Sequence, residues 1–424
     1  TEDGNFITQW RDENRTEYYS DSRGCFDGNY KDPDSEITIT GTSTGNTVTI
    51  DADKGTTANV TLKDVEINAS STGKAAVDVT GSGDTNIELN GNNTLTGGNQ
   101  YAGLQHNKEI DAERKEASGK LTITDTDGNG SLCATGNYGG AGIGGGNFND
   151  AGKIEITGGS ITATGGTDGA GIGGGGSGGD ADITISGGTI NAIGGTDPWG
   201  QPNAIGGAGI GGGGSGGDAT VTITGGAVIE KATGGGAGAG IGGGYSSKSD
   251  VTISGNATIE TVTGGKQSAG IGGGGRTSTG KVTIQDNATI KKAQGGDGGA
   301  GIGGGLGGSG TDVTVSNDAQ VKVQGGEKYE SVGAGAGAGA GIGDGGKPGQ
   351  DGAELPQKPD QLKEGTIQYY APGADMQTDA PTKILYNPDG NHSWDGGTVT
   401  SPATCTTPGV KTYTCLTNPA HTKT

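Results

Sequence analysis

The chain has 424 residues, of which 98 are glycine and only 4% are aromatic, and its formal net charge is −21. This composition leaves too few large side chains for one compact core, and the irregular glycine runs exclude the strict three-residue period of collagen. The negative charge disfavours nucleic acid and anionic membranes as partners, and no apolar run reaches the roughly 18 residues of a membrane-spanning helix.

Residues 1–35 are acidic with scattered aromatic residues, and we expect them to form an N-terminal cap. From residue 36 apolar and polar residues alternate in short blocks, such as Val48-Thr49-Ile50 and Ile87-Glu88-Leu89. Each block predicts a short strand with one buried face, which argues against disorder as the explanation for the high glycine content. Residues 97–119 interrupt the pattern, and their charged part, 108–117, is expected to form a short helix on an excursion from one coil.

The sequence Ala-Gly-Ile-Gly-Gly-Gly occurs at 141–146, 170–175, 208–213, 239–244, 269–274 and 300–305, and it returns as Ala-Gly-Ile-Gly-Asp-Gly at 340–345. Self-similarity of this kind indicates a solenoid. Each unit holds three short apolar blocks separated by turns, and parallel strands have to meet again one full coil later. We therefore predict an all-β protein whose residues 36–345 form a right-handed parallel β-helix, with three short strands in each coil of about 30 residues.

Alternation along each strand predicts which side chains fill the core. The Ala and Ile of every repeat are expected to point inward and its glycines outward, leaving a bare strip of backbone. The second strand should bury pairs such as Ile183 and Ile185, and the third a small residue such as Ala192, two positions before a Gly pair.

Outward residues on the second strands are often Thr, as at Thr222 and Thr252. A flat array of Thr is what an ice-binding surface would use, but Thr is also an ordinary exposed strand residue, and charged residues interrupt this array. We expect the charges to pair between coils, Lys153 with Asp182 and Lys281 with its neighbouring aspartates.

After residue 345 the composition changes. Residues 346–390 predict a Pro- and Gly-containing linker followed by two strands, 366–370 and 382–386, that serve as a C-terminal cap. Residues 391–424 predict a separate small module. Its Cys405 and Cys415 are expected to form a disulfide or, with His392 and His421, to bind zinc.

The repeat motif also satisfies the dinucleotide-binding pattern G-x-G-x-x-G, as at 140–145. That function requires a strand before the motif and a helix after it, and neither the recurrence nor the flanking residues fit. Catalysis is not expected either. A glycosidase needs two carboxylates that face each other across a cleft, and the repeats carry no stacked carboxylate pair or nucleophile with an adjacent base.

Two coils are longer than the others, and both grow just before the Ala-Gly-Ile motif. Insertions gathered at one corner of a solenoid often build its binding face, and an exposed Trp offers a flat surface for sugars or a partner protein. The alternative is that the Trp folds back over its own loop. The residues that we expect to bind a ligand are Asp197, Trp199, Gln201 and Asn203 in the first loop, and Lys328, Tyr329 and Glu330 in the second.

The alternating blocks at 65–68, 76–80, 87–97 and 121–124, followed by the Ala-Gly-Ile-Gly-Gly-Gly coils, resemble large cell-surface proteins of gut Firmicutes, similar to clostridial carbohydrate-binding-domain-containing proteins. The segment from His392 through Trp394 to Cys415 resembles part of a small repeat module common in such surface proteins. The resemblance implies an extracellular, secreted or wall-attached location and a binding role. It identifies no binding residue and no cofactor, and it leaves calcium open.

The sequence thus favours a non-catalytic bacterial surface protein or adhesin. The expected ligand is a glycan, either plant polysaccharide or host mucin. The alternatives are binding to a host protein such as an immunoglobulin, and a purely structural stalk.

Overall fold

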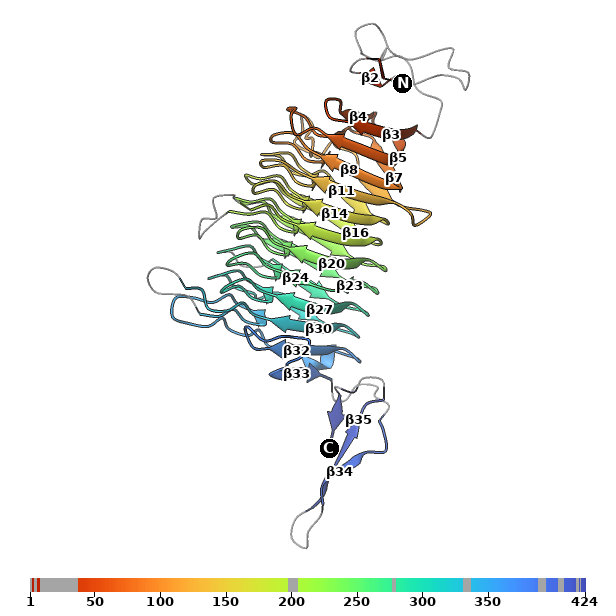
Figure 1. The fold of residues 1–424 in the computed structure, drawn as a ribbon. Helices are drawn as coiled ribbons and strands as arrows, with labels where there is room; N and C mark the ends of the chain where they lie inside the picture. Colours follow the sequence, from red (N-terminus) through yellow and green to blue (C-terminus); the bar gives the residue numbers. More distant parts are fainter. Residues whose placement is uncertain are drawn as a thin grey trace.

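The computed structural model describes residues 2–3, 6–7, 37–196, 205–276, 280–330, 337–387, 394–402, 408–416, 419 and 421–424. These residues form an elongated stack of strands (Figure 1), and the only helix among them is the short 3-10 helix η1 (Pro359–Gln361). The all-β prediction is confirmed. None of the described helical residues forms a segment long and apolar enough to cross a membrane.

One sheet contains ten strands, all parallel, and its members are the Ala-Gly-Ile-Gly segments and their counterparts in the first coils. Identical positions of successive repeats are paired, so that Ile143 faces Ile172 and Ile172 faces Ile210. The strands are β4 (Val48–Ala52), β6 (Val77–Gly81), β9 (Leu104–Gln105), β12 (Ile143–Gly144), β15 (Ile172–Gly173), β18 (Ile210–Gly211), β21 (Ile241–Gly242), β25 (Ile271–Gly272), β28 (Ile302–Gly303) and β31 (Ile342–Gly343).

The remaining strands of the stack form a sheet of 21 strands, in which two parallel rows run side by side. The first row is β3 (Ile37–Ser43), β5 (Thr57–Asn68), β7 (Asp84–Asn90), β10 (Leu121–Thr124), β13 (Ile154–Ile156), β16 (Ala181–Ile185), β19 (Ala219–Ile223), β22 (Ser249–Ile253), β26 (Val282–Ile284) and β29 (Val313–Val315). The second row is β8 (Asn92–Thr96), β11 (Ser131–Thr135), β14 (Ser160–Thr164), β17 (Thr189–Ile193), β20 (Val228–Thr233), β23 (Thr258–Ile259), β24 (Val262–Thr263), β27 (Thr289–Gln294), β30 (Gln320–Gln324) and β32 (Thr366–Tyr370). Strand β5 pairs with both β7 and β8 and so joins the two rows.

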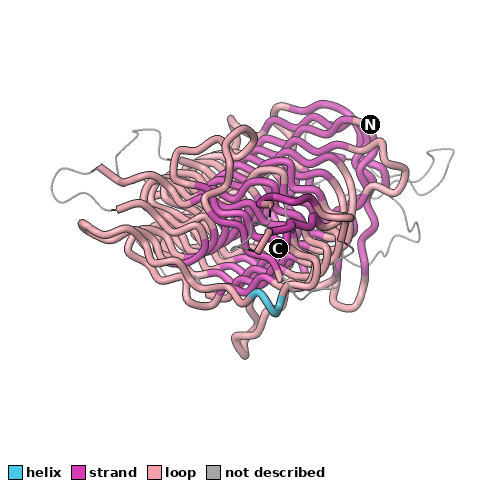
Figure 2. The backbone as a smooth tube through the Cα atoms, turned by 90° about the horizontal axis from the view of Figure 1, so that it is seen from below, coloured by secondary structure: helices cyan, strands magenta, loops and turns pink. Residues whose placement is uncertain are grey.

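The core lies between these sheets and follows the columns that alternation predicts. Ile183, Ile185 and Ala192 are fully buried, as are the Ala and Ile of the glycine repeats, such as Ala208 and Ile210. Seen along the stack, the strands superpose row upon row and the loops gather at the corners (Figure 2). Each large aliphatic side chain in such a column stabilises the fold by about 1.5–3 kcal/mol, and its partners are the same residues of the coils above and below.

The prediction that the repeat glycines point outward onto an open surface is wrong. The fourth residue of each motif adopts φ between 128° and 140°, a region that residues with a side chain avoid. A Cβ at Gly211 would lie 1.9 Å from the carbonyl oxygen of Gly242 in the next coil, and one at Gly144 would lie 2.1 Å from that of Gly173. The glycines are therefore buried between coils, where the backbones approach too closely for any side chain.

The expected helix at 108–117 is also wrong. The segment leaves the stack as a loop closed by an antiparallel bridge between Ile110 and Glu116. The Asp111 carboxylate accepts hydrogen bonds from the backbone N–H groups of Glu113 and Lys115, and Arg114 has a φ of 60°. Aspartate caps a tight turn in this way, which competes with helix formation.

The C-terminal part first adds one more parallel strand to the stack and then changes to antiparallel pairing. Strand β32 pairs in parallel with β30, and β33 (Lys383–Tyr386) then pairs with β32 in the antiparallel sense. Within the segment predicted to be a linker, the Glu354 carboxylate accepts the backbone N–H groups of Gly341 (2.6 Å) and Ile342 (3.1 Å) on the last strand of the ten-stranded sheet. Beyond it lies an antiparallel sheet of β34 (Thr398–Ser401), β35 (Val410–Thr414) and β36 (Thr422–Lys423). At the other end, β1 (Glu2–Asp3) and β2 (Phe6–Ile7) form one antiparallel pair.

Candidate functional site

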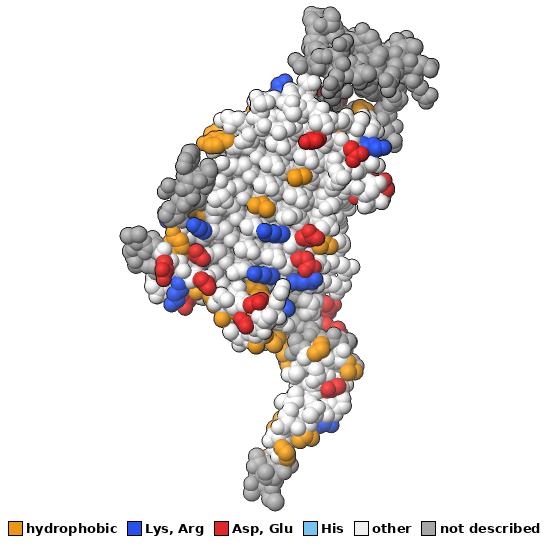
Figure 3. Space-filling view, in the orientation of Figure 1, with side chains coloured by type: hydrophobic (Ala, Val, Ile, Leu, Met, Phe, Trp, Pro, Cys, Tyr) orange, Lys and Arg blue, Asp and Glu red, His pale blue; other side chains and the backbone are white. Residues whose placement is uncertain are grey.

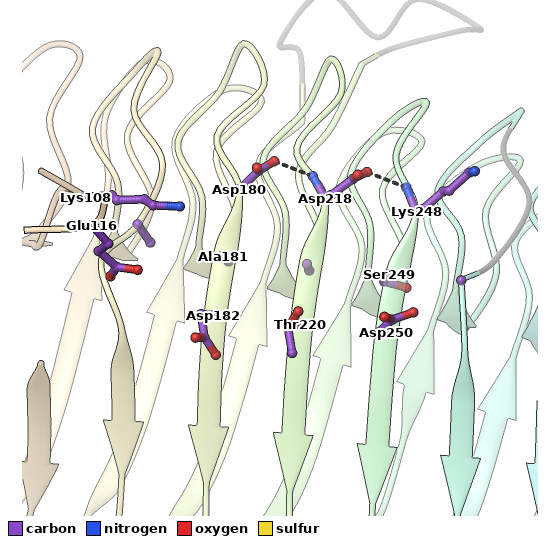
Figure 4. Close-up of a pocket in the computed structure, with 13 residues that line it drawn as sticks. Lys108, Glu116, Asp180, Ala181, Asp182, Asp218, Thr220, Lys248, Ser249 and Asp250 are labelled. Carbon is purple, nitrogen blue, oxygen red and sulfur yellow. Dashed lines mark hydrogen bonds between the residues drawn. The ribbon is translucent and has the colours of Figure 1, made fainter. Parts of the chain in front are cut away.

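A groove of about 470 Å³ crosses the first row of strands at the points where β16, β19 and β22 begin. We call it the aspartate groove (Figure 4). It is lined by Lys108, Glu116, Ala151, Asp180, Ala181, Asp182, Asp218, Ala219, Thr220, Lys248, Ser249, Asp250 and Gly280. Five carboxylates and two ammonium groups therefore face this space, so its electrostatic potential is negative.

A chain of hydrogen bonds runs along one wall of the aspartate groove. The carboxylate of Asp150 accepts the backbone N–H of Asp180 (3.0 Å), Asp180 accepts that of Asp218 (2.8 Å), and Asp218 accepts that of Lys248 (2.7 Å). Each aspartate thus reaches from its own coil to the coil that follows, and Figure 4 shows the last two of these contacts. Because each carboxylate is held by a main-chain donor, the positions of the acceptor oxygens are fixed by the strand register.

Burial in this wall has an electrostatic effect. Partial burial raises the pKa of the Asp180 carboxyl above its ordinary value, while the hydrogen bond from the backbone of Asp218 acts in the opposite direction. The carboxylates of Asp150 and Asp218 raise it further, and Lys108 lowers it. Lys108 itself lies 3.9 Å from Asp150, on the loop that closes one end of the groove.

The second wall carries three polar side chains, of which the Asp250 carboxylate accepts the backbone N–H of Lys281 in the next coil (2.7 Å). Asp182, Thr220 and Asp250 occupy paired positions on β16, β19 and β22, and all three are exposed. Between the walls lie the small side chains of Ala181, Ala219 and Ser249. The result is an open trough with oxygen acceptors along both sides and a nearly flat floor.

Of the ligand-binding residues predicted from the sequence, four are outside the described residues: Asp197, Trp199, Gln201 and Asn203. The base of their loop is closed by an antiparallel bridge between Thr196 and Gly206. In the second loop Lys328 and Glu330 are exposed and Tyr329 is half-buried. None of the three described residues lines the aspartate groove, so this groove and the second loop are separate places on the surface.

The predicted inter-coil ion pairs are replaced by other contacts. Asp250 accepts the backbone N–H of Lys281 at 2.7 Å, so the carboxylate is held by the main chain and not by the ammonium group. Among the described residues the closest ion pair between coils joins Lys120 to Glu155, at 2.5 Å. The strand register explains this change, since a short carboxylate reaches the next backbone N–H more easily than a long side chain on the same row.

The Thr column is present, and it is interrupted. Thr184, Thr222, Thr252, Thr283 and Thr314 are paired from coil to coil and are half-buried, whereas Glu155 occupies the same column before them. Figure 3 shows single charged side chains scattered over a largely uncharged face. No helix follows 140–145, in keeping with the rejection of a dinucleotide site.

Two groups of residues are relevant to metal binding. Carboxylate oxygens of Glu88, Asp125 and Asp127 lie within 4.8 Å of one another, on neighbouring coils. In the C-terminal module, His421 is buried, its Nε2 atom lies 2.6 Å from the Thr366 hydroxyl and its ring stacks on Tyr386. Cys405 and His392 lie outside the described residues, so the predicted disulfide or zinc site stays a prediction.

The aspartate groove was missed by the sequence analysis although the sequence contains a signal for it. The segment Gly-Gly-Asp-Ala occurs at 178–181 and again at 216–219, and Asp150-Ala151 stands at the same place in the preceding coil. An acidic residue at one fixed position of consecutive repeats predicts a column of carboxylates. Comparison with protein-family models, with curated proteins and with solved structures gives no significant match.

Proposed function

We propose that the stack is a right-handed parallel β-helix with three short strands in each coil, displayed outside a bacterial cell. Three sets of parallel pairings support the coil, because each repeat adds one strand to the ten-stranded sheet and one to each row of the larger sheet. The right hand follows from the strong preference of parallel crossover connections. The acidic, polar surface suits a secreted or wall-attached protein of the gut Firmicutes type that the repeats resemble.

We further propose that the protein binds glycans without catalysing a reaction on them. The observation that carries this proposal is the aspartate groove, an open trough in which carboxylate oxygens recur from coil to coil. A sugar chain presents hydroxyl donors at repeated intervals, and carboxylates held by the main chain are strong acceptors for them. Asp182 and Thr220 are exposed and can contact the ligand, and Asp250 can do so with the carboxylate that also accepts the backbone N–H of Lys281. Lys248 offers a donor at the rim.

The charge of the groove limits the glycans that fit. Five carboxylates repel uronic and sialic acids, so neutral plant polysaccharide or the uncharged parts of mucin chains are favoured. The long loops at 197–203 and 328–330 would then contact a polymer, or a host protein that bears it, outside the groove. The aspartates that form the wall are engaged with backbone N–H groups, which supports a binding role over an acid–base role in catalysis.

A glycan array tests this proposal, with the native chain compared with three variants. Asp182→Asn removes an exposed groove charge, and we expect it to weaken binding about tenfold or more, the loss of one charged hydrogen bond. Glu230→Gln changes an exposed carboxylate that does not line the groove and should leave binding unchanged. Trp199→Ala reports on the long loop. The proposal fails if no glycan is retained, or if Asp182→Asn and Glu230→Gln bind alike.

The same experiments separate the alternatives. Retention of one host protein such as an immunoglobulin, with no glycan bound, would favour the protein-binding hypothesis. A stalk without a ligand is supported by the uninterrupted parallel pairing from β4 to β31. The release of new reducing ends from plant polysaccharide or mucin would show that the protein is an enzyme and would contradict a purely binding role.

A further inference from the structure

One corner of the stack differs from all the regular ones. Between the first and second rows the later coils turn in three residues, at 157–159 and 186–188, or in four, as at 224–227 and 254–257. Between β10 and β11 the connection is longer and covers the residues 125–130. The inserted residues have polar side chains or are glycines, so the packing of the core does not account for the insertion.

The sequence of this corner is Asp125-Thr-Asp127-Gly-Asn129-Gly130. It matches the first six positions of the calcium-binding loop D-x-[DN]-x-[DN]-G, in which oxygen ligands alternate along the chain before a glycine at the sharp turn. The motif is an observation about the sequence alone, and it points to a hard, oxygen-preferring cation independently of where the side chains lie.

The fold of the loop agrees with that pattern. The Asp125 carboxylate accepts the backbone N–H groups of Gly128 (3.0 Å), Asn129 (3.2 Å) and Gly130 (3.1 Å), which wraps the loop around its first residue. The Asn129 amide donates to Asp127 at 2.7 Å. A Cβ at Gly130 would lie 2.5 Å from the Cβ of Leu89, so the sixth position requires glycine.

The match ends after the sixth position, and the structure supplies what the sequence lacks. The calcium loop has a glutamate at its twelfth position, which here would be residue 136, a glycine. Instead Glu88 enters from the preceding coil, because β7 pairs with β10 and sets Glu88 beside Thr124. Its two carboxylate oxygens accept hydrogen bonds from the backbone N–H (2.7 Å) and the hydroxyl (3.0 Å) of Thr126. These contacts hold the Glu88 carboxylate against the loop.

The three carboxylates then converge without a cationic side chain between them. One oxygen from each of Glu88, Asp125 and Asp127 lies within 4.8 Å of the others. The ion pairs of the described residues involve other carboxylates, those of Asp150, Glu155, Glu260 and Asp344. Three negative charges gathered in this way repel one another, and a divalent cation would remove that repulsion.

We propose that Glu88, Asp125 and Asp127, supported by Asn129, bind one calcium ion at this corner and so fasten two coils together. The site shares no residue with the aspartate groove, and the inference does not depend on the proposed glycan binding. Two independent observations carry it: the calcium-loop sequence and the carboxylate from the neighbouring coil that completes it. Mg²⁺ is the poorer fit, since it demands strict octahedral geometry and gives up its waters reluctantly.

The test is a titration of the whole chain, freed of metal by a chelator, with calcium chloride followed by calorimetry and by thermal unfolding. We expect one site with a dissociation constant of about 10⁻⁴ M or tighter, the range in which calcium modules outside the cell begin, and a rise in the unfolding temperature. Magnesium chloride at the same concentrations should bind at least tenfold more weakly.

Three variants assign the binding to this corner. Glu88→Gln and Asp127→Asn keep the shape of the side chain and remove one charge, and each should weaken calcium binding tenfold or more. Glu66→Gln removes an exposed charge from strand β5 and should change nothing. The inference is overturned if the native chain shows neither heat of binding nor a thermal shift with calcium. It is equally overturned if both site variants bind as the native chain does. The native titration decides the matter even if a variant does not fold.

Discussion

The first coils and the glycine array build the same ten-stranded sheet in two chemically different ways. Leu104 and Ile143 are paired in the same buried column, and the next residues, Gln105 and Gly144, are paired as well. In the first coils this second position carries side chains, and Gln105 donates to Asp78 at 3.1 Å. In the array it is always glycine with φ above 120°.

The difference shows that the stack does not require glycine in general. It requires glycine wherever the main chain turns into the positive-φ region and lies against the carbonyl oxygen of the next coil. Where β4 and β6 run as regular five-residue strands, side chains fit at the same level. The repeat glycines thus record a change of backbone geometry at the second position of these strands, from ordinary extended backbone, as at Gln105, to the positive-φ region.

The largest effect should come from a side chain placed at a glycine of the array. Gly211→Val puts a branched side chain at φ 138° and within 1.9 Å of a carbonyl oxygen, so we expect a loss of roughly 4 kcal/mol or more. Thermal unfolding followed by circular dichroism measures it. Gly226→Ala is the matched control, because nothing lies within 4 Å of its added Cβ. Equal unfolding temperatures for the two variants would contradict the comparison.

Shortening a core side chain should affect both regions alike. Ile210→Ala in the array and Leu104→Ala in the first coils each remove fully buried atoms from the same column. We expect each change to destabilise the protein by about 2–5 kcal/mol, the usual result of a cavity in a packed core. Chemical unfolding of the two variants side by side provides the measurement. If only one of them is destabilised, the two regions do not share one continuous core.

A pH effect on stability near neutral pH should come from the first coils, where His106 occupies a buried position beside β9. Burial lowers the pKa of His106, which the carbonyl oxygens of Val79 and Gly119 and the carboxylates of Glu116 and Asp78 counteract in part. Since the folded state then disfavours the proton relative to an unfolded value near 6.5, stability is retained above that pH and lost as the pH falls through it.

We therefore expect the native chain to unfold at a lower denaturant concentration when the pH falls from about 7.5 to about 5.5, and His106→Gln to reduce this shift. Asp78 acts in the opposite direction. Burial raises the pKa of its carboxyl, so protonation of Asp78 stabilises the folded state as the pH falls. Amide hydrogen exchange followed by NMR should show that the loss of stability at low pH is centred on residues near β9. A shift of equal size in His106→Gln would exclude His106 as its source.

The smallest effect should come from a surface ion pair of the array. The ammonium nitrogen of Lys291 lies 2.6 Å from a carboxylate oxygen of Glu260 on the neighbouring coil, and both side chains are well exposed. Lys291→Ala should lower the stability by less than about 1 kcal/mol, and added salt should shrink the difference. Unfolding at low and high ionic strength measures both. A loss as large as that of Ile210→Ala would mean that the array depends on surface charge.

The sequence predicted the core well because alternation and a fixed repeat locate buried columns without knowledge of the turns. It failed where the outcome depends on backbone geometry between coils. The direction of the glycines could not be inferred from alternation, because Gly144 and its equivalents lie outside the normal strand region. The loop at 108–117 has a helical composition, yet the Asp111 carboxylate stabilises a turn.

The candidate sites divide in the same way. The aspartate groove depends on a column of residues that any repeat alignment reveals once Asp180 and Asp218 are placed at one position. The carboxylates of Glu88 and Asp127 are separated by one whole coil, and only the pairing of β7 with β10 brings them together. A motif within one segment was visible in the sequence, whereas a partner from a neighbouring coil was not.

The in-register pairing of identical repeats has a consequence for how such a chain changes length. Every coil of the array offers the coil above and the coil below the same surface, with Ile opposite Ile and Gly opposite Gly. Duplication or deletion of one whole unit in the gene therefore preserves the Ile and Gly pairing of this sheet and moves the two ends by about 4.8 Å. A deletion of part of a unit destroys the register of all the strands it touches. The length of the stack can thus change in small, equal steps while the pairing of the ten-stranded sheet stays the same.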